Sequence, residues 1–441
     1  MNNQLGGEMK PTVSLNWGKG KMDLELPVGW KVISIMQPNA IKAAPNPRQE
    51  ILKSLAKPIG CKKLAEMAKG KKKIALVIDD ISRPTPVGLV APAVMAELKK
   101  AGVKPQQVTV IPAIGLHRPM PVKEVEARTK VKGLKVVNPD CDDEGKLVNL
   151  GTTSRGSPVW VCNEVAKADL VISIGCIEPH IIASFGGGYK NLFPGAAGRA
   201  TTAHNHSLNS SPHTFNMVGQ PIDKNPMRQD LEEAGKMIKA PVFIINTVLN
   251  SKLEVVRVVC GDPVEAHRVG AEASARIYGV KVPGTADVVI TSSHPMDSDL
   301  RQGVKALANT IRSVKKGGIL ITLVKADEGV GVFGLANKKL PLSKGALKFL
   351  APVLLPLIPK LKIKGLGEED KFFLYFALKA MTLAKMLIYA PTIPEKVKAN
   401  LPFVDFVDSP AQAIEIAKQK VGEKADVLLF PHGGSTFPIL G

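Results

Sequence analysis

Short runs of apolar and β-branched residues alternate with longer segments in which apolar residues recur every three or four positions. Each short run has the length of a buried strand, and each longer segment has the period of a helix that buries one face. The alternation is typical of βαβ units, in which crossover helices join parallel strands. The strands predicted in this way span residues 74–78, 108–114, 170–177 and 242–248, and the first crossover helix spans 87–101.

The same pattern returns in the second half of the chain after a pause at a single helical segment, 263–280. A strand is predicted at 286–291 and a helix at 297–314. A further helix at 410–421 precedes a last strand at 427–430. The sequence therefore predicts an α/β fold.

Two domains are expected, because 441 residues exceed what one hydrophobic core usually holds. Each should be a mostly parallel sheet flanked by helices, with the active site in the cleft between them. The expected parts are an N-terminal domain over 1–265, a linking helix over 266–284, a C-terminal domain over 285–408, a second linking helix over 409–424, and a last strand within 425–441 that packs back on the first domain.

The segment 339–390 is rich in Leu, Pro and Lys. Its charges are weakly segregated, which favours a helical subdomain, with a helical end, over a membrane-surface helix. The apolar run 349–359 carries three prolines and is too short to span a bilayer. The N-terminal sequence lacks the apolar region of a signal peptide. We therefore expect a cytoplasmic chain without stable membrane insertion.

The chain carries 59 basic and 39 acidic residues, a formal net charge of +20. Such a charge suits nucleic acid, an anionic membrane surface or an anionic small molecule. Lysines spread along the chain and an aromatic content of 5% argue against nucleic acid. The five cysteines are scattered without a CxxC pair, so neither a disulfide framework nor a zinc knuckle is indicated.

Polar residues that directly follow predicted strands are the first functional candidates, because parallel sheets bind ligands at the carboxyl ends of their strands. Asp80 and Arg83 follow the first strand, and a guanidinium can bind a carboxylate or phosphate with two hydrogen bonds. Alternatively, the two residues pair with each other and fix a turn. His117 follows the second strand and is either an acid–base group or a solvated loop residue.

The third strand leads into the densest group of candidates. His180 is followed by three consecutive glycines, Gly186, Gly187 and Gly188, and by Lys190. The N–H groups of a glycine run can approach a phosphate closely, and a lysine adds charge or a nucleophilic amine. The motif GxxxxGK[ST] of a Walker loop is absent. A flexible glycine hairpin would explain the glycines but not the accompanying histidine.

Two further pairs complete the candidates. His204 and His206 could ligate a transition metal such as nickel, copper or zinc, although the sequence does not show the remaining ligands. Gln302 and Lys305 lie three positions apart near the start of a predicted helix and therefore on one face of it. An ordinary exposed helix face is the alternative for this second pair.

Taken together, these motifs resemble those of the nickel-dependent lactate racemase family. The resemblance spans about residues 74–307 and rests on the ordered motifs DDISRPTP, GLHRP, EPHIIASFGGGYKNLFPGAAG, NHSLN, NPMRQDLEEAG, NTVLN, GDPVEAHRVG and DSDLRQGVKAL. It implies a racemase or epimerase of a small anionic 2-hydroxy acid. The implied reaction is reversible hydride transfer to a nickel pincer nucleotide through a 2-keto acid. The resemblance also implies that cofactor-synthesis proteins activate the chain.

Residue roles follow from the same resemblance. Lys190 resembles the lysine that can link covalently to the cofactor, and His206 resembles the nickel-ligating histidine. His117 and His180 look like the pair that serves as acid and base on the substrate hydroxyl. The three glycines are then expected to contact the cofactor.

The remaining matched positions are polar. Asp80 and Arg83 resemble active-site residues that contact the cofactor, and Arg83 also resembles a substrate contact. Gln302 and Lys305 look like contacts to the substrate carboxylate or the cofactor.

Two positions depart from the family pattern. Where many relatives have a glycine-rich turn, and an aromatic residue before the glutamine, this chain has His294 and Arg301. Arg301 is therefore expected to contact substrate, in a pocket more cationic than one for lactate. Two alternatives stay open at this point: a cofactor-independent racemase that forms an enolate, and a phosphate- or nucleotide-binding protein without catalysis.

Overall fold

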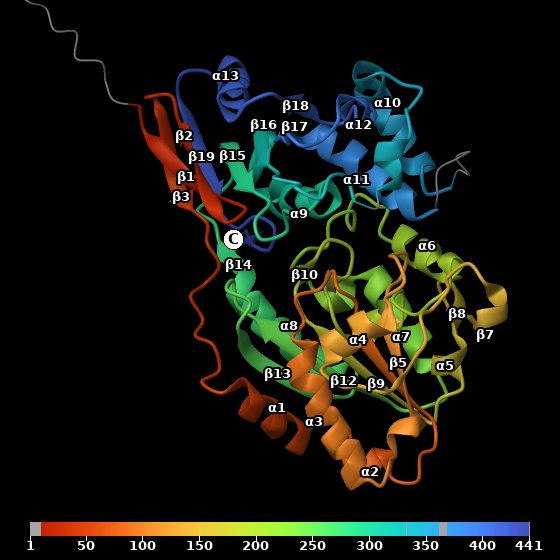
Figure 1. Ribbon diagram of the computed structural model, residues 1–441. Coiled ribbons are helices and arrows are strands. Elements are labelled where there is room, and N and C mark those ends of the chain that lie inside the picture. Colours follow the sequence, from red (N-terminus) through yellow and green to blue (C-terminus); the bar gives the residue numbers. More distant parts are fainter. Residues whose placement is uncertain (1–9, 332, 361–367, 441) are drawn as a thin grey trace, which may run out of the picture. The chain divides into compact units, whose positions relative to one another are not determined.

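The computed structural model describes residues 10–331, 333–360 and 368–440, which form two compact units (Figure 1). We name them by their place in the sequence. The central unit consists of residues 40–209 and 219–277, and the terminal unit consists of residues up to 39, residues 210–218 and residues from 278 onward.

The central unit is built on a six-stranded sheet in the order β13-β12-β9-β4-β5-β6. All neighbouring strands are parallel except β12 and β13, which are antiparallel. The strands are β4 (Ile74–Asp79), β5 (Val108–Ala113), β6 (Lys135–Val136), β9 (Leu170–Cys176), β12 (Val242–Leu249) and β13 (Val255–Gly261), and the first crossover helix is α3 (Val87–Lys100). The four strands and the helix predicted for this region are thus confirmed.

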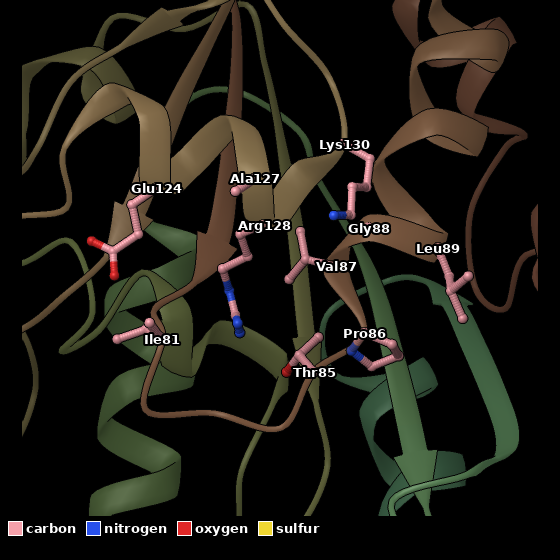
Figure 2. Close-up of a pocket in the computed structure, with 10 residues that line it drawn as sticks. All are labelled: Ile81, Thr85, Pro86, Val87, Gly88, Leu89, Glu124, Ala127, Arg128 and Lys130. Carbon is pink, nitrogen blue, oxygen red and sulfur yellow. The ribbon is translucent and has the colours of Figure 1, made fainter.

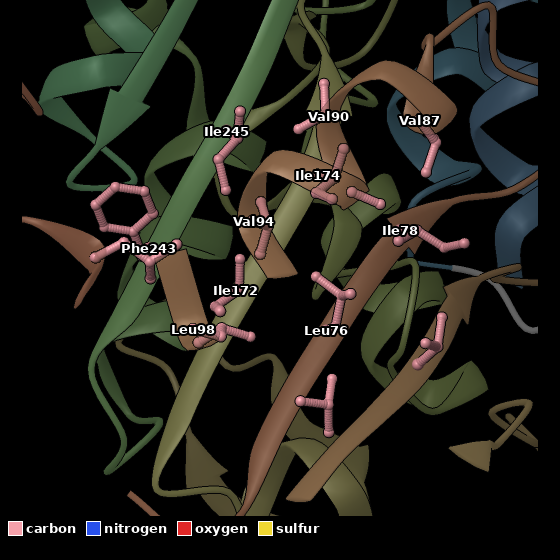
Figure 3. Close-up of a cluster of buried hydrophobic side chains, with 14 of the residues drawn as sticks. Leu76, Ile78, Val87, Val90, Val94, Leu98, Ile172, Ile174, Phe243 and Ile245 are labelled. Atoms are coloured by element: carbon pink, nitrogen blue, oxygen red, sulfur yellow. The ribbon is translucent and has the colours of Figure 1, made fainter. Parts of the chain in front are cut away.

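Helix α3 shows why the apolar period predicts this architecture. Val90, Val94 and Leu98 recur at every fourth position and form one buried stripe. Figure 3 shows this stripe against the sheet, where Leu76 of β4 and Ile172 of β9 belong to the same core. Burying a side chain of this size contributes roughly 1.5–3 kcal/mol relative to leaving it exposed.

Smaller elements surround this sheet. They are α1 (Pro47–Ala56), α2 (Leu64–Ala68), α4 (Val122–Thr129), β7 (Leu147–Thr152), β8 (Pro158–Cys162), α5 (Asn163–Ala166), β10 (Pro179–His180), β11 (Ser184–Phe185), η3 (Gly188–Asn191), α6 (Arg199–Ser207), α7 (Pro226–Lys236) and α8 (Glu265–Tyr278). The single helix predicted at 263–280 corresponds to α8.

The terminal unit contains a second six-stranded sheet in the order β18-β17-β16-β15-β19-β3, in which all neighbours are parallel. Its strands are β3 (Trp30–Ile35), β15 (Ala286–Ser292), β16 (Val314–Leu323), β17 (Lys385–Tyr389), β18 (Asp405–Val407) and β19 (Ala425–Phe430). Helix α13 (Pro410–Val421) and the hairpin β1 (Thr12–Trp17)–β2 (Gly20–Glu25) share a core with this sheet, and α9 (Leu300–Thr310) and α11 (Glu368–Leu383) pack on β15 or β16. The two mostly parallel sheets flanked by helices confirm the predicted fold class.

Both ends of the chain belong to the terminal unit, whereas the predicted bounds assign residues 1–39 and the last strand to the first domain. Strand β3 falls within 1–265 but pairs with β19 in the terminal sheet. Strand β19 falls within 425–441 and also pairs with β15 of the same sheet, whereas we expected it to pack on the first domain. Hydrophobic period reports that a strand is buried but not which strand it pairs with.

The segment 339–390 forms a helical subdomain only in part. It contains α10 (Lys344–Leu357) and α11, but the chain after Leu383 becomes strand β17. The prediction of a helical end was therefore wrong at β17. A short apolar run cannot be assigned to helix or strand by period alone, and pairing with β16 and β18 decided it. Within the described ranges, none of the helices has the length and hydropathy needed to cross a membrane.

Candidate functional site

The carboxyl ends of three central strands carry the first sequence-predicted residues. Strands β5 and β9 flank β4 in parallel, so the loops that follow all three strands leave from the same edge of the sheet. Asp80 directly follows β4, His117 follows β5, and His180 lies on β10 after β9. Two side-chain contacts join these loops.

The first contact joins His117 to Asp80. The imidazole Nδ1 lies 2.5 Å from Asp80 Oδ2, and the Ser82 hydroxyl donates to Oδ1 of the same carboxylate at 2.6 Å. Burial by itself raises the pKa of Asp80, but the hydrogen bonds from His117 and Ser82 outweigh it and lower the pKa below its ordinary value. Asp80 is therefore an anion that holds His117 by Nδ1.

The second contact joins Arg83 to Glu178, with 2.6 Å between Nη1 and Oε1. Burial by itself lowers the pKa of Arg83, but the carboxylates of Glu178 and Asp79 raise it by a larger amount. The pKa of Arg83 is therefore above its ordinary value. The sequence had offered pairing of Asp80 with Arg83 as an alternative; the structure gives each a different partner. Glu178 was missed, although its place just after β9 was a usable signal.

A buried scaffold lies beneath these contacts. The Asp79 carboxylate accepts hydrogen bonds from the Thr85 hydroxyl and from the backbone N–H of Cys176, at 3.1 Å for the latter. Arg128 of α4 donates to the carbonyls of Asp79 and Arg83, both at 2.9 Å. Burial raises the pKa of Asp79. Arg128 thus ties both ends of the loop to α4, and no local sequence pattern marked it for this role.

His180 is oriented by its own turn. Its Nδ1 accepts hydrogen bonds from the backbone N–H groups of Ile182 and Ala183, at 3.2 and 3.1 Å. A ring nitrogen that accepts has no proton, so this pattern assigns the proton of the neutral imidazole to Nε2. His117 and His180 are therefore held in opposite ways, one with Nδ1 facing a carboxylate and one with Nδ1 accepting from amides.

The three glycines are packed inside the protein. Gly186 N–H donates to the Glu178 carbonyl at 2.7 Å, and Gly188 N–H donates to Asn246 Oδ1 at 2.8 Å. Gly187 has φ +75°, and a Cβ there would lie 2.7 Å from Asn246 Oδ1. Two of the three amides expected to face a phosphate are thus used within the chain. Close packing explains why these positions are glycine.

A buried arginine anchors the same loop. Arg228 of α7 is fully buried and donates to the backbone carbonyls of Ala183, Phe185 and Gly187. Burial lowers the pKa of Arg228 to about 10, so it remains a cation at neutral pH. The motif NPMRQDLEEAG contains it, but nothing local indicates that its partners lie about forty residues earlier.

The two predicted cofactor ligands both belong to the central unit. Lys190 lies in η3 and His206 on α6, and both are partly exposed. The His204 ring makes a hydrogen bond within the chain, since its Nε2 lies 3.1 Å from the Arg155 carbonyl oxygen. Within the described residues, His, Cys, Asp and Glu form no group of three or more suited to a metal ion.

The other predicted substrate contacts belong to the terminal unit. Gln302 and Lys305 lie on the first turns of α9, whose N-terminus is capped by Asp299 Oδ1, 2.8 Å from the N–H of Gln302. The Arg301 guanidinium lies 5.4 Å from the centre of the Phe373 ring. His294 lies after β15, and its ring centre is 5.3 Å from that of His432.

A pocket of about 530 Å³ lies beside the Asp80–Thr85 loop (Figure 2). It is lined by Ile81, Thr85, Pro86, Val87, Gly88, Leu89, Glu124, Ala127, Arg128 and Lys130. Figure 2 shows the Arg128 side chain extending from α4 toward this loop. The predicted catalytic and cofactor residues are absent from this lining, so it is not the predicted site.

Comparison with known proteins places the chain in a family. A lactate racemase of Lactiplantibacillus plantarum is 31% identical over 294 residues, which cover 64% of this chain and 67% of that protein. The chain belongs to the lactate racemase family. A model of the lactate racemase N-terminal domain also matches residues 17–216. The lactate racemase of Thermoanaerobacterium thermosaccharolyticum is 27% identical over 435 residues, 96% of this chain and 98% of that protein.

Solved structures agree with the fold of a lactate racemase. The lactate racemase apoprotein of T. thermosaccharolyticum superposes with a TM-score of 0.82 at 24% identity, covering 97% of this chain and all of that one. A protein of Thermotoga maritima superposes with a TM-score of 0.67 at 18% identity, covering 91% of this chain and all of that one. Membership in a racemase family makes the chain an isomerase.

Proposed function

We propose that the chain interconverts the stereoisomers of a small 2-hydroxy acid by reversible hydride transfer to a nickel pincer nucleotide, through a 2-keto acid. Family membership supports the reaction class. The contact between His117 and Asp80 supports the acid–base part most directly. A histidine that donates Nδ1–H to a carboxylate keeps the Nε2 lone pair for a substrate proton.

The donor types of the central unit fit the proposed cofactor. The imidazole of His206 suits nickel, and the amine of Lys190 suits a covalent or ionic link to the nucleotide. When bound, this cofactor supplies a reversible acceptor for hydride. The glycines fit less well as a phosphate cradle, because Gly186 and Gly188 donate within the chain.

His117 and His180 divide the proton chemistry. His117 accepts the hydroxyl proton at Nε2, and the Asp80 carboxylate stabilises the resulting imidazolium. His180 presents Nε2–H, which donates a hydrogen bond to the substrate oxygen. This bond polarises the carbonyl group of the keto acid. Arg83 is charged and contacts the substrate carboxylate. Contacts of Gln302 and Lys305 to substrate are proposed on the family resemblance. A substrate contact of Arg301 is proposed because a cation stands where many relatives have an aromatic residue.

The test is made with protein produced together with cofactor-synthesis proteins and nickel. A panel of 2-hydroxy acids is incubated in deuterated water, and stereoisomers and α-deuterium are followed by chiral chromatography and NMR. We expect interconversion with the α-hydrogen retained. Interconversion with deuterium at the α-carbon would support an enolate racemase instead. If no panel member is interconverted although nickel is bound, substrates with a second carboxylate are tested next, and their failure would overturn the proposal.

A further inference from the structure

Helix α10 carries an apolar face that points to solvent. Phe349, Val353 and Leu357 are 83%, 58% and 40% exposed, and their i, i+4, i+8 spacing places them in one stripe. Pro352 and Pro356 lie on the same side and are also exposed. No large apolar side chain among the described residues is more exposed than Phe349. Contiguous apolar faces of this kind mark interaction sites, whereas single exposed residues do not.

The opposite face of α10 is firmly packed. Leu347, Ala351 and Ile358 are buried, and α10 lies against α11 (Figure 1). The helix also begins at a regular cap, in which Ser343 Oγ accepts a hydrogen bond from the Ala346 N–H. Helix α10 therefore already buries its core-facing side against the protein. The apolar stripe is the opposite, outer side of the helix.

Along α10 and the residues that flank it in sequence, every charged side chain is a lysine. Residues 338–360 contain five lysines and no acidic residue. Lys344 is paired with Asp405 at 2.5 Å, but Lys348 and Lys360 are exposed beside the two ends of the stripe. An apolar stripe flanked by lysines is complementary to a surface in which a layer of negatively charged groups covers an apolar interior.

We propose that α10 binds the surface of a membrane that contains anionic lipids. The stripe enters the boundary between head groups and acyl chains, and the lysines lie among the lipid phosphates. The helix has 14 residues, about 21 Å at 1.5 Å per residue, so it lies on the bilayer and does not span it. The sequence favoured a helical subdomain over a membrane-surface helix. In this proposal α10 is a packed helix of the terminal unit whose exposed stripe contacts the membrane surface. This proposal does not depend on the proposed reaction.

The test measures co-flotation of the full chain with vesicles. Vesicles of phosphatidylcholine alone are compared with vesicles that contain phosphatidylglycerol, at low salt and at 0.5 M salt. The double variant Phe349→Ser/Val353→Ser removes the stripe without changing charge, and Lys348→Glu/Lys360→Glu reverses the flanking charge. Leu52→Ser on α1 is the matched control, because Leu52 is 45% exposed and belongs to the central unit, whereas α10 belongs to the terminal unit. Circular dichroism checks that each variant is folded.

We expect the wild type and Leu52→Ser to bind anionic vesicles at least about tenfold more tightly than neutral ones, with loss in high salt. Both α10 variants should bind at least about tenfold more weakly. Equal binding to both vesicle types, no binding, or binding unchanged by Phe349→Ser/Val353→Ser would overturn the proposal. A wild-type dimer that the stripe variant converts to a monomer would show instead that a second copy covers α10.

Discussion

At the scale of single residues, the candidate site depends on a few side chains with assigned hydrogen-bond roles. Asp80 is kept ionised by His117 and Ser82 despite its burial. His117 and His180 have different partners at Nδ1, and the different roles proposed for the two histidines rest on this difference. Arg228 supplies the donors that the buried loop carbonyls need.

Replacement of Asp80 by Asn should lower kcat/KM of the nickel-loaded enzyme by roughly 10²–10³-fold, because the amide cannot stabilise an imidazolium at His117. Steady-state racemisation assays measure the effect. Activity is expressed per bound nickel, because Asp80 also resembles a residue that contacts the cofactor. Asp408→Asn, at an exposed position, is the matched control and should retain activity. Near-wild-type activity of Asp80→Asn would remove His117 from the base role.

Replacement of Arg228 by Met should lower the free energy of unfolding by about 3–5 kcal/mol, because three buried carbonyls lose their donor. Urea titration followed by circular dichroism measures this change. Arg257→Met is the control at an exposed position and should change stability by about 0.5 kcal/mol or less. Equal stability of the two variants would show that Arg228 does not anchor the loop.

At the scale of elements, the chain after β9 is more constrained than a glycine-rich loop suggests. Its glycines lie against β12 through Asn246, and its carbonyls face α7. The bond from the Gly186 N–H to the Glu178 carbonyl fixes it to the strand end that also holds Arg83. The loop is therefore a rigid support for His180 and Lys190.

Gly70 and Gly187 have the same φ of +75° but different surroundings. Comparing their alanine variants therefore distinguishes the cost of backbone strain from the cost of close packing. Gly70→Ala should cost about 1 kcal/mol, because nothing lies within 4 Å of its Cβ position. Gly187→Ala should cost about 3–4 kcal/mol, because its Cβ would lie 2.6 Å from Ile177 Cγ1 and 2.7 Å from Asn246 Oδ1. Denaturant unfolding of both variants gives the comparison. Similar costs would mean that the loop can move away from β12.

At the scale of the whole molecule, stability should fall in acid partly because histidines are buried uncharged. Burial lowers the pKa of His432 to about 4, with a smaller contribution from His294. The unfolded chain then binds more protons than the folded chain between pH 6.5 and 4. His432 therefore favours the folded state above pH 6.5, and this stabilisation is lost as the pH falls to 4.

Replacement of His432 by Gln should make the pH dependence shallower in that window. The wild type should lose about 1–2 kcal/mol more than the variant between pH 7 and 4, a value reduced for partial exposure of the ring. Denaturant unfolding at pH 7, 5.5 and 4 measures the difference. Parallel pH profiles for the two proteins would contradict the assigned burial of His432.

The sequence by itself determined the fold class and most of the buried strands, because hydrophobic period is a local property of the chain. It also placed Asp80, His117 and His180 after strands, since the end of an apolar run is visible without a partner. It did not determine that β3 pairs with β19 or that Arg83 forms an ion pair with Glu178. Nor did it determine that Arg228 donates to the carbonyl of Gly187. These contacts join residues far apart in sequence. Only tertiary structure decided them, because strand order and burial fix which distant polar groups satisfy one another.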